Sequence, residues 1–475
     1  MTGRGPCSAM RLSICERNYA SPISHQLLVL GNGFDITCGL NSRFVQFFRP
    51  RMAVIDKNKN ISKKGWVKTL SASGITAWDL ILYFRKELAD KGYDVNWSDV
   101  ELAVSDVIEM ERCSGALPSS SPMDRQHFVA IRTLLEYFVF LQSHPWIKWP
   151  NQYLTQLNEK IEKSTGYDWG KLQEDVFREM REAGYFEDDD DSGRLHTVSD
   201  IFPYTYADID DYRDALKEQT PGLAVEVVAS FLCGLYVDVK SWTQNSLRSV
   251  LEQELHKLEA EFSRYLSREV KLNNEYCEAS EQLMEQLLSG MTSWDDGRVA
   301  EATVLSFNYT SPSIPSIWRN EPTFKFINIH GRLNGDIIFG ADGTNCMDDS
   351  GAARFSKTFR IIRSGRPGGG EPIAFGAPSK EEPRETVVIK VFGHSLAKAD
   401  YAYFQAIFDI VDIYTGPVEL VFFYKSYCET AREELLLNIS RLLDSYGASM
   451  DNRDHGKNLM HRLILEGRLS VVELP

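Results

Sequence analysis

Short apolar runs near the two ends of the chain predict β-strands. The first run, residues 27–30, is followed at once by the glycine-containing segment 31–33. The later runs are rich in Val, Ile and Phe and alternate little with polar residues, as expected when both faces of a parallel sheet are covered. These later predicted strands are residues 303–307, 324–329, 336–339, 386–392, 418–423 and 469–474.

Helical spacing of apolar residues predicts helices around these strands. Residues 36–48, after the first strand, are predicted to form a helix or a structured turn, and helices at residues 401–410 and 428–442 separate later strands. Between residues 65 and 298, strand signals are sparse and helical periodicity is common. One long helix is predicted by an apolar stripe that consists of Leu251, Leu255, Leu258, Phe262 and Tyr265.

Alternation of strands and helices favours an α/β fold with a doubly wound, Rossmann-like, mostly parallel sheet. The first strand must then pair with strands that begin only at residue 303. We therefore predict a discontinuous nucleotide-binding domain, residues 24–64 plus 299–475. A large helical insertion, residues 65–298, is the second predicted domain.

Weaker local signals have simple structural interpretations. Ser98 and Glu101 form a capping box, which predicts the start of a helix. A second aromatic-led helix start lies at Tyr167. The acidic run 187–191 predicts a solvated loop, and the glycine-rich segment 364–370 predicts a flexible one.

Composition narrows the functional classes. The chain has 475 residues, a net charge of −15, 43% hydrophobic and 25% charged residues, which is typical of a globular protein. The acidic balance argues against nucleic acid as a partner, because phosphate neutralisation dominates that affinity. No apolar stretch approaches the roughly 20 residues that cross a bilayer, and residues 1–19 do not resemble a signal peptide. The eight cysteines include no C-x-x-C pair, which argues against disulfides and structural zinc and favours the cytoplasm.

Four short motifs follow predicted strands. In doubly wound sheets, ligands bind at the carboxyl ends of the strands, close to the point where the strand order reverses. Small and polar residues at four such ends therefore predict one shared pocket. The motifs are residues 31–35 (GNGFD), 306–310 (SFNYT), 328–331 (NIHG) and 393–396 (GHSL).

With these motifs the sequence resembles the AbiH family of bacterial phage abortive-infection proteins. This resemblance implies a role in antiphage defence, where a phage-derived trigger and a homo-oligomer are open questions. It rests on residues 31–35 with Gly39 and Leu40, on residues 307–310, 329–331, 338–340 and 393–396, and on Asp400, Tyr403 and Phe404.

The same motifs, in the same order, are more distantly similar to those of sirtuin-like NAD-binding domains. The chain departs from that pattern at Asp35, Asn41, Thr310 and His394, where the superfamily has Ser, Pro, Asp and Thr. Its zinc module is also missing, because only Cys346 lies between the third and fourth motifs. The likeness therefore implies hydrolysis of NAD, with NAD as substrate and no metal, rather than peptide deacylation.

The resemblance implies a role for each predicted site residue. Asn308 would hold the ribose and the attacking water, and His330 would act as general base. Backbone amides of the glycine turn would hold the pyrophosphate. Asp35 and Ser395 would face ribose hydroxyls or adenosine. The remaining predicted pocket residues are Gly31, Asn32, Gly33, Phe34, Gly331, Gly393 and His394.

Other interpretations of the same residues stay open. His330 and His394 also fit structural roles, and Asn308 also fits a turn cap. The Thr310 substitution is compatible with a sensor that binds NAD or ADP-ribose without cleaving it. A nucleic-acid-directed toxin would need a cluster of carboxylates for a metal, for which Asp35, Asp400 and Asp409 are the candidates.

Overall fold

The computed structural model describes residues 23–58, 65–84, 100–105, 107, 225–239, 243–289, 300–333, 335–341, 353–365, 372–396, 400–426, 430–450 and 453–475. Several sequence-based expectations lie outside these residues. They are the helix starts at Ser98 and Tyr167, the acidic run 187–191 and most of the glycine-rich loop.

Six strands form one sheet in the order β3-β2-β1-β4-β5-β6, and every neighbouring pair is parallel. This confirms the predicted α/β class. The order reverses between β1 and β4, as it does in doubly wound dinucleotide-binding sheets. The strands are β1 (Ile23–Leu30), β2 (Glu301–Ser306), β3 (Phe324–Asn328), β4 (Arg384–Phe392), β5 (Glu419–Tyr424) and β6 (Leu469–Glu473).

The predicted strand at residues 336–339 is wrong. In place of a strand, this segment forms a single antiparallel bridge between Gly331 and Ile337. The N–H of Phe339 donates to the side chain of Glu259 at 2.6 Å. Ile337 and Phe339 are nevertheless 3% exposed, so the apolar run is buried against helices without a neighbouring strand.

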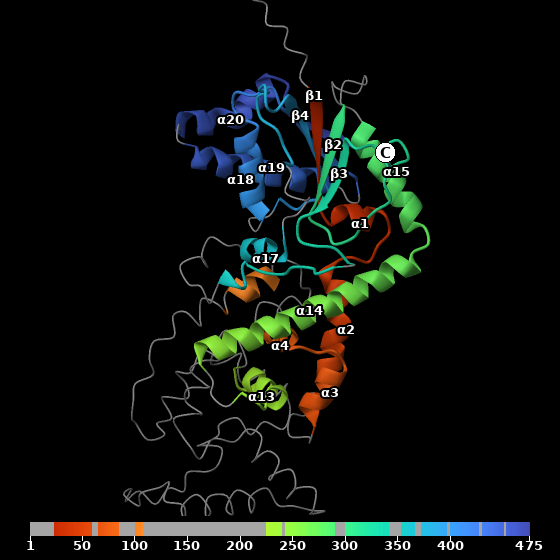
Figure 1. Cartoon of the computed structure of the whole chain (residues 1–475), viewed down its shortest axis with the longest axis vertical. Helices are drawn as coiled ribbons and strands as arrows, with labels where there is room; N and C mark the ends of the chain where they lie inside the picture. The colour runs from red at the N-terminus through yellow and green to blue at the C-terminus, as the bar shows by residue number, and fades with distance from the viewer. Residues whose placement is uncertain are drawn as a thin grey trace, which may run out of the picture.

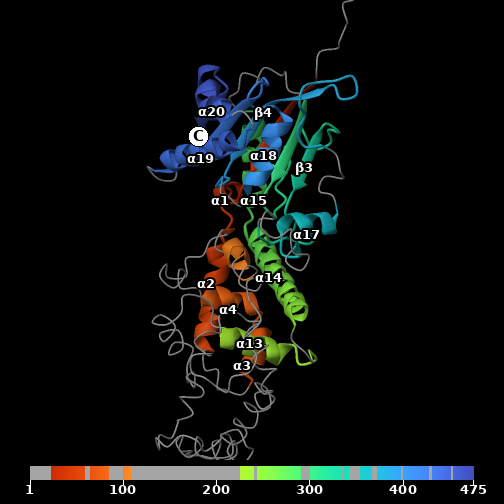
Figure 2. The same ribbon diagram turned by 90° about the vertical axis from the view of Figure 1, so that its left-hand side faces the viewer.

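Helices cover both faces of the sheet (Figures 1 and 2). Leu28 and Leu30 of β1 face a core shared with α1 (Gly33–Thr37) and α15 (Tyr276–Ser289). Leu27 and Val29 face the opposite core, as alternation along a strand requires. That second core is closed by α18 (Tyr401–Ile410), α19 (Ala431–Ser449) and α20 (Arg453–Leu465).

The helix predictions near the sheet have mixed outcomes. Residues 401–410 are confirmed as α18, whereas α19 begins and ends later than the predicted 428–442. Residues 36–48, predicted to form a helix or a structured turn, contain the end of α1 at Thr37, a turn, and the start of α2 (Phe44–Lys57). Gly39 adopts a φ of 79° between the two helices, a conformation that glycine reaches without strain.

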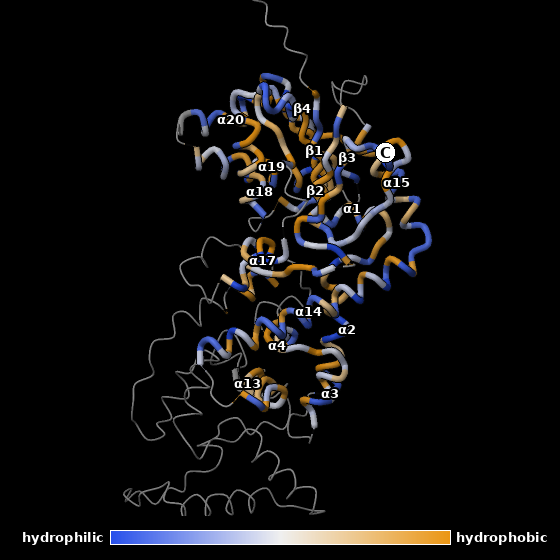
Figure 3. Tube along the Cα trace, in the orientation of Figure 1, coloured by the Kyte–Doolittle hydropathy of each residue, from blue (hydrophilic) through white to orange (hydrophobic). Residues whose placement is uncertain are grey.

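The described elements between β1 and β2 are all helices. They include α3 (Trp66–Ala72), α4 (Ala77–Tyr83), α13 (Val225–Leu235) and the long α14 (Gln244–Leu272). The predicted stripe on α14 is confirmed, with Leu255, Leu258 and Phe262 fully buried. Figure 3 shows hydrophobic residues along the strands and mixed hydropathy along α14. Although it is 29 residues long, α14 is too polar to span a bilayer, and no other described helix could span one.

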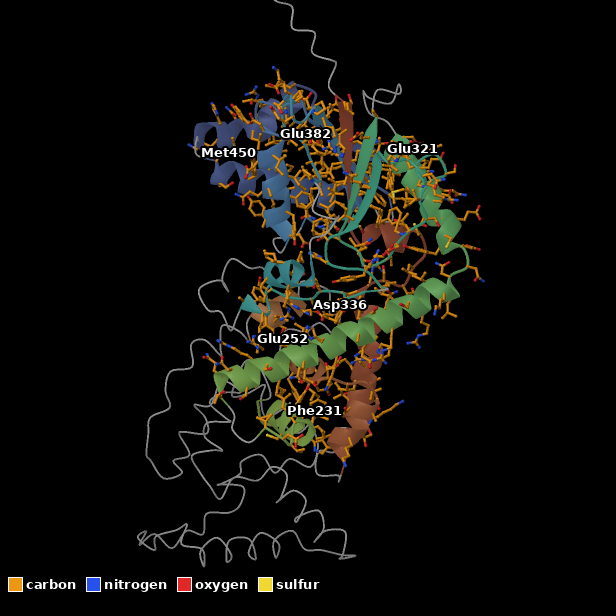
Figure 4. The ribbon with its side chains drawn as sticks, in the orientation of Figure 1. Phe231, Glu252, Glu321, Asp336, Glu382 and Met450 are labelled. Atoms are coloured by element: carbon orange, nitrogen blue, oxygen red, sulfur yellow. The ribbon has the colours of Figure 1, made fainter. Side chains whose placement is uncertain are left out.

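The helical part and the sheet part share side-chain packing. Tyr309, which follows β2, and Phe355 belong to the same buried cluster as α2, α4 and α14. The short α17 (Lys357–Ser364), which was not predicted, lies between α14 and the sheet in both ribbon views (Figures 1 and 2). Side chains fill the space between the layers (Figure 4). The division into two domains stays a prediction.

Candidate functional site

The strand register brings the four motifs to one edge of the sheet. Leu30 pairs with Ser306 on one side and with Phe392 on the other, and Ser306 pairs with Asn328. The next residue of each strand therefore lies in the same row. Because all six strands run in the same direction, this row is the carboxyl edge, where ligands bind in such sheets.

The glycine turn after β1 packs directly against the turn after β4. A Cβ atom on Gly31 would lie 2.4 Å from the Cα of His394, and one on Gly33 would lie 2.6 Å from the Cα of Gly393. The N–H of Gly31 donates to Phe392 O at 3.0 Å, and that of Gly33 donates to Gly393 O at 2.8 Å. These two amides are thus used within the protein, so phosphate binding by the turn stays a prediction that requires other donors.

Asp35 lies inside the fold rather than at the surface of the edge. It is 1% exposed and accepts hydrogen bonds from Tyr276 at 2.7 Å and from Thr310 at 2.8 Å. Burial raises the pKa of its carboxyl group to about 6, against the lowering effect of those two hydroxyl groups. Asp35 thereby ties the glycine turn to α15 and to the end of β2. Phe34 is also buried, in the core beneath the sheet.

Asparagine side chains connect the turns along the edge. Asn308 is 6% exposed, and its Nδ2 donates to Gly31 O at 3.0 Å. Asn328 donates to the carbonyls of Asn308 and Thr310, each at 2.8 Å. Asn32 is bound to Ser42 through both ends of its amide. Asn308 therefore contacts the glycine turn, while Asn32 stabilises the following loop.

Two histidines converge on Asp400 at this edge. His394 Nδ1 accepts the N–H of Leu396 at 2.9 Å, so its Nε2 carries the proton and points to Asp400 Oδ2 at 3.4 Å. His330 Nε2 lies 3.9 Å from Asp400 Oδ1. Within the described part of the chain, this His330 nitrogen is buried and has no hydrogen-bond partner.

Lys357 completes the cluster from α17. Its Nζ lies 3.2 Å from Asp400 Oδ1 and also pairs with Glu101. The ammonium group, followed by His394 and His330, holds the pKa of Asp400 well below its usual range despite burial. Burial, together with Lys357, lowers the pKa of His330 to about 3. At neutral pH the site thus pairs an uncharged imidazole with an ionised carboxylate.

An aromatic ring holds the two imidazoles apart. Phe307 contacts the His394 ring edge-on at 4.6 Å between centroids and the His330 ring at 5.4 Å. Tyr403 packs on the same phenylalanine at 5.4 Å, and Phe404 stacks on it at 6.3 Å. These contacts fix both ring planes. All three aromatic residues belong to the motifs that carry the family resemblance.

The other predicted pocket residues differ in accessibility. Gly331 has a φ of 89°, and a Cβ atom there would collide with the carbonyl of Asp336. This glycine therefore allows the chain to turn directly after His330. Ser395 is exposed beside the cluster. The structure thus gathers Asn308, His330 and His394 with the glycine turns.

Lys357 and Glu101 were missed as site residues by sequence reasoning. The signal at Glu101 was a capping box, which has a sufficient local explanation, and Lys357 belongs to no motif. Asp400 was noted only through the family resemblance and as a candidate metal ligand. The charged residues of this site come from three separate segments of the chain. No regular spacing links those segments, so no sequence pattern could identify the residues together.

The carboxylates considered for a metal-dependent toxin do not gather. Asp35 is bound to Tyr276, Asp400 to His394 and Lys357, and Asp409 accepts from Tyr446 at 2.7 Å. The residues that the structure describes contain no group of three His, Cys, Asp or Glu side chains suited to a metal ion.

Two open surface clefts lie away from the histidines. One runs along α14 beside Leu333, and the other lies between the α1–α2 loop and the α14–α15 junction. Neither is lined by His330 or Asp400. The clefts and the histidine cluster therefore indicate different places for a ligand. The buried His330 Nε2, which has no hydrogen-bond partner among the described residues, is the more specific of the two indications.

Comparison with known proteins identifies a family for part of the chain. A family model described as "Bacteriophage abortive infection AbiH" matches residues 237–424. The matched segment contains Asn308, His330, Lys357 and the β4 turn, but neither the glycine turn after β1 nor Glu101. No curated protein and no solved structure is significantly similar to the chain.

Proposed function

We propose that this chain, which matches the AbiH family model over residues 237–424, hydrolyses NAD to nicotinamide and ADP-ribose. The family suggests a role in phage abortive infection, and depletion of NAD would stop phage growth along with the host. The observation that carries the proposal is His330 Nε2, which is buried without a partner at the carboxyl edge, 3.9 Å from Asp400 Oδ1.

The reaction suits an uncharged imidazole beside a carboxylate. Breaking the bond between C1′ and the nicotinamide nitrogen sends its electron pair to the ring, which leaves as a neutral molecule. Positive charge then develops on the ribose, and the ionised Asp400 would stabilise it in a site that excludes water. Water adds to C1′ and releases one proton.

His330 would accept the hydrogen bond, and then the proton, of that water. Its pKa of about 3 makes it a weak base. A weak base is adequate because water bound to an oxocarbenium-like carbon is strongly acidic. Asp400 Oδ1, which lies 3.9 Å from the same nitrogen, would stabilise the resulting imidazolium.

Asn308 would act on the ribose. One end of its amide is used by Gly31 O, and the other end offers an acceptor to a sugar hydroxyl. The pyrophosphate would be held by donors other than the amides of Gly31 and Gly33, because those two amides donate within the protein.

The test is release of nicotinamide from NAD, measured by chromatography with purified protein and in phage-infected cells. His330→Ala should reduce the rate about 100-fold or more, the usual contribution of a general base. Asn308→Ala should also lower it. His461→Ala serves as the matched control, because this histidine is exposed on α20. Thermal unfolding of each variant checks that the fold survives.

Three outcomes decide the proposal. Release by wild type and the His461 variant, with loss in the His330 variant, supports it. Absence of release in purified protein and in infected cells rejects it. Calorimetric binding of NAD without turnover would favour a sensor, for which the use of Thr310 to hold Asp35 is the supporting observation.

A further inference from the structure

Lys357 is a buried cation in an unfavourable place. It is 5% exposed and is the first residue of α17, directly after the capping residue Ser356. The positive end of the helix dipole lies at this terminus, so a cation there is destabilised. Removing an ammonium group from water also costs free energy unless it is paired. The position is therefore poorly explained by the stability of α17 alone.

Two carboxylates hold this ammonium group. Lys357 Nζ pairs with Glu101, and it lies 3.2 Å from Asp400 Oδ1. The backbone N–H of Lys357 donates to Ala341 O at 3.0 Å, which fixes the main chain at this residue. The three charges form a chain from a helical segment between β1 and β2, through α17, to the edge of the sheet.

Asp400 is oriented at both oxygens by this arrangement. Lys357 faces Oδ1, while Nε2 of His394 lies 3.4 Å from Oδ2. The carboxylate plane is thereby fixed, and Oδ1 remains the oxygen nearest to His330, at 3.9 Å. Loss of Lys357 would free the carboxylate to rotate away from the imidazole.

We infer that Lys357, anchored by Glu101, is a positioning residue that orients Asp400 and keeps His330 uncharged. The charged and titratable groups that face His330 are Lys357, Asp400 and His394. Only Lys357 carries a fixed positive charge among them, so it opposes protonation of the imidazole, whereas Asp400 favours it. The consequence for catalysis rests on the proposed function, but the protonation state of His330 does not.

The position of the Lys357 ammonium group also depends on Glu101. Glu101 belongs to the described helical segment 100–105, which lies between β1 and β2 in the sequence. The site edge is otherwise built from residues that follow β1, β2, β3 and β4. The ammonium group is therefore shared between the helical part and the sheet part, and its position depends on both.

The test compares Lys357→Gln with Lys357→Arg by NMR of histidine-labelled full-length protein, with the His330 resonance assigned from a His330→Gln variant. The titration runs down to about pH 3, and the His330 ring should stay uncharged above about pH 5 in wild type and in the arginine variant. In the glutamine variant, its titration midpoint should rise by about one pH unit or more. Glutamine keeps two N–H donors and removes the charge, although its side chain is one bond shorter than that of lysine.

Arg363→Met is the matched control, because Arg363 lies on the same helix and pairs with Glu252 instead. A rise confined to Lys357→Gln supports the inference. No rise in that variant, or an equal rise in Arg363→Met, overturns it. If the glutamine variant does not fold, a raised midpoint in Lys357→Arg, which retains the charge, overturns the inference, and an unchanged one supports it.

Cleavage of NAD provides a separate readout. Lys357→Gln should lower the rate about 100-fold, as expected when a catalytic group is displaced by about 1 Å. If wild type does not cleave NAD, the proposed function fails while the NMR result still decides the role of Lys357.

Discussion

At the scale of single residues, Asp35 is a buried carboxyl group that the fold makes harder to ionise. Its pKa is 3.8 in an unfolded chain and about 6 in the protein. Between these values the folded protein binds a proton that the unfolded chain has released. The stabilising contribution of this proton is complete below about pH 4 and is lost as the pH rises through about 6.

In the wild type, the free energy of unfolding should therefore fall as the pH rises from about 4 to about 6. We expect Asp35→Asn to remove this fall. The difference between wild type and variant should change by about 3 kcal/mol over that range, since each pKa unit corresponds to about 1.4 kcal/mol. Urea unfolding at a series of pH values measures it. Parallel curves would contradict the prediction.

Tyr276→Phe is a useful companion variant. It removes a hydroxyl group that donates to Asp35 and lowers its pKa. The fall in stability should then extend to higher pH. This shift distinguishes titration of Asp35 from titration of a group elsewhere in the molecule.

Single-residue roles were only partly predictable from the sequence. His330, Asn308 and the glycines could be identified because each directly follows a strand, and strand ends meet at one edge. Lys357 and Glu101 could not, because their partners are determined by packing of α17 and of residues 100–105. The involvement of Asp35 with Tyr276 was also hidden, since α15 was not expected to cover the glycine turn.

At the scale of elements, a buried ion pair joins α14 to α17. Glu259 accepts from Arg360 Nη2 at 2.8 Å and from the N–H of Phe339 at 2.6 Å. The side chain of Glu259 is 6% exposed and that of Arg360 is 4% exposed. Glu252 on the same helix pairs with Arg363, whose side chain is 47% exposed.

Glu259→Gln should therefore destabilise the protein by about 3–5 kcal/mol, because a buried guanidinium group loses its counter-charge. Glu252→Gln, the matched control, should cost about 1 kcal/mol or less. Adding Arg360→Met to Glu259→Gln should recover most of the loss, since both charges are then gone. Urea unfolding tests all three, and equal losses at positions 259 and 252 would disprove the prediction.

This pair also explains why element prediction failed at residues 336–339. An apolar run indicates that a segment is buried, but not which element it forms. Most of the apolar runs in this chain form strands, because each of them pairs with a neighbouring strand of the sheet. The segment 336–339 was buried in another way, since Glu259 takes the N–H of Phe339. The turn at Gly39 separates two helices in residues 36–48, where the sequence predicted a helix or a structured turn without deciding between them. Long periodic patterns, such as the stripe on α14, were reliable because packing and propensity agreed.

At the scale of the whole molecule, β1 lies at the centre of a sheet whose other strands begin at Glu301. The helices between them are not separate from the sheet. Tyr309 follows β2, is 9% exposed, and packs on Phe262 of α14 at 6.0 Å between ring centroids. The two parts thus share a buried cluster, and we expect them to open together.

Tyr309→Ala should accelerate amide hydrogen exchange in α14 and in β1 and β2 alike, because it removes packing worth about 3–5 kcal/mol that both parts share. Phe231→Ala is the control, since Phe231 is fully buried on α13 within the helical part (Figure 4). Its effect should be larger in α13 and α4 than in the strands. If Tyr309→Ala left exchange in β1 and β2 unchanged, the helical part would be an independent folding unit, and its coupling to the site through Glu101 would have to act without a shared core.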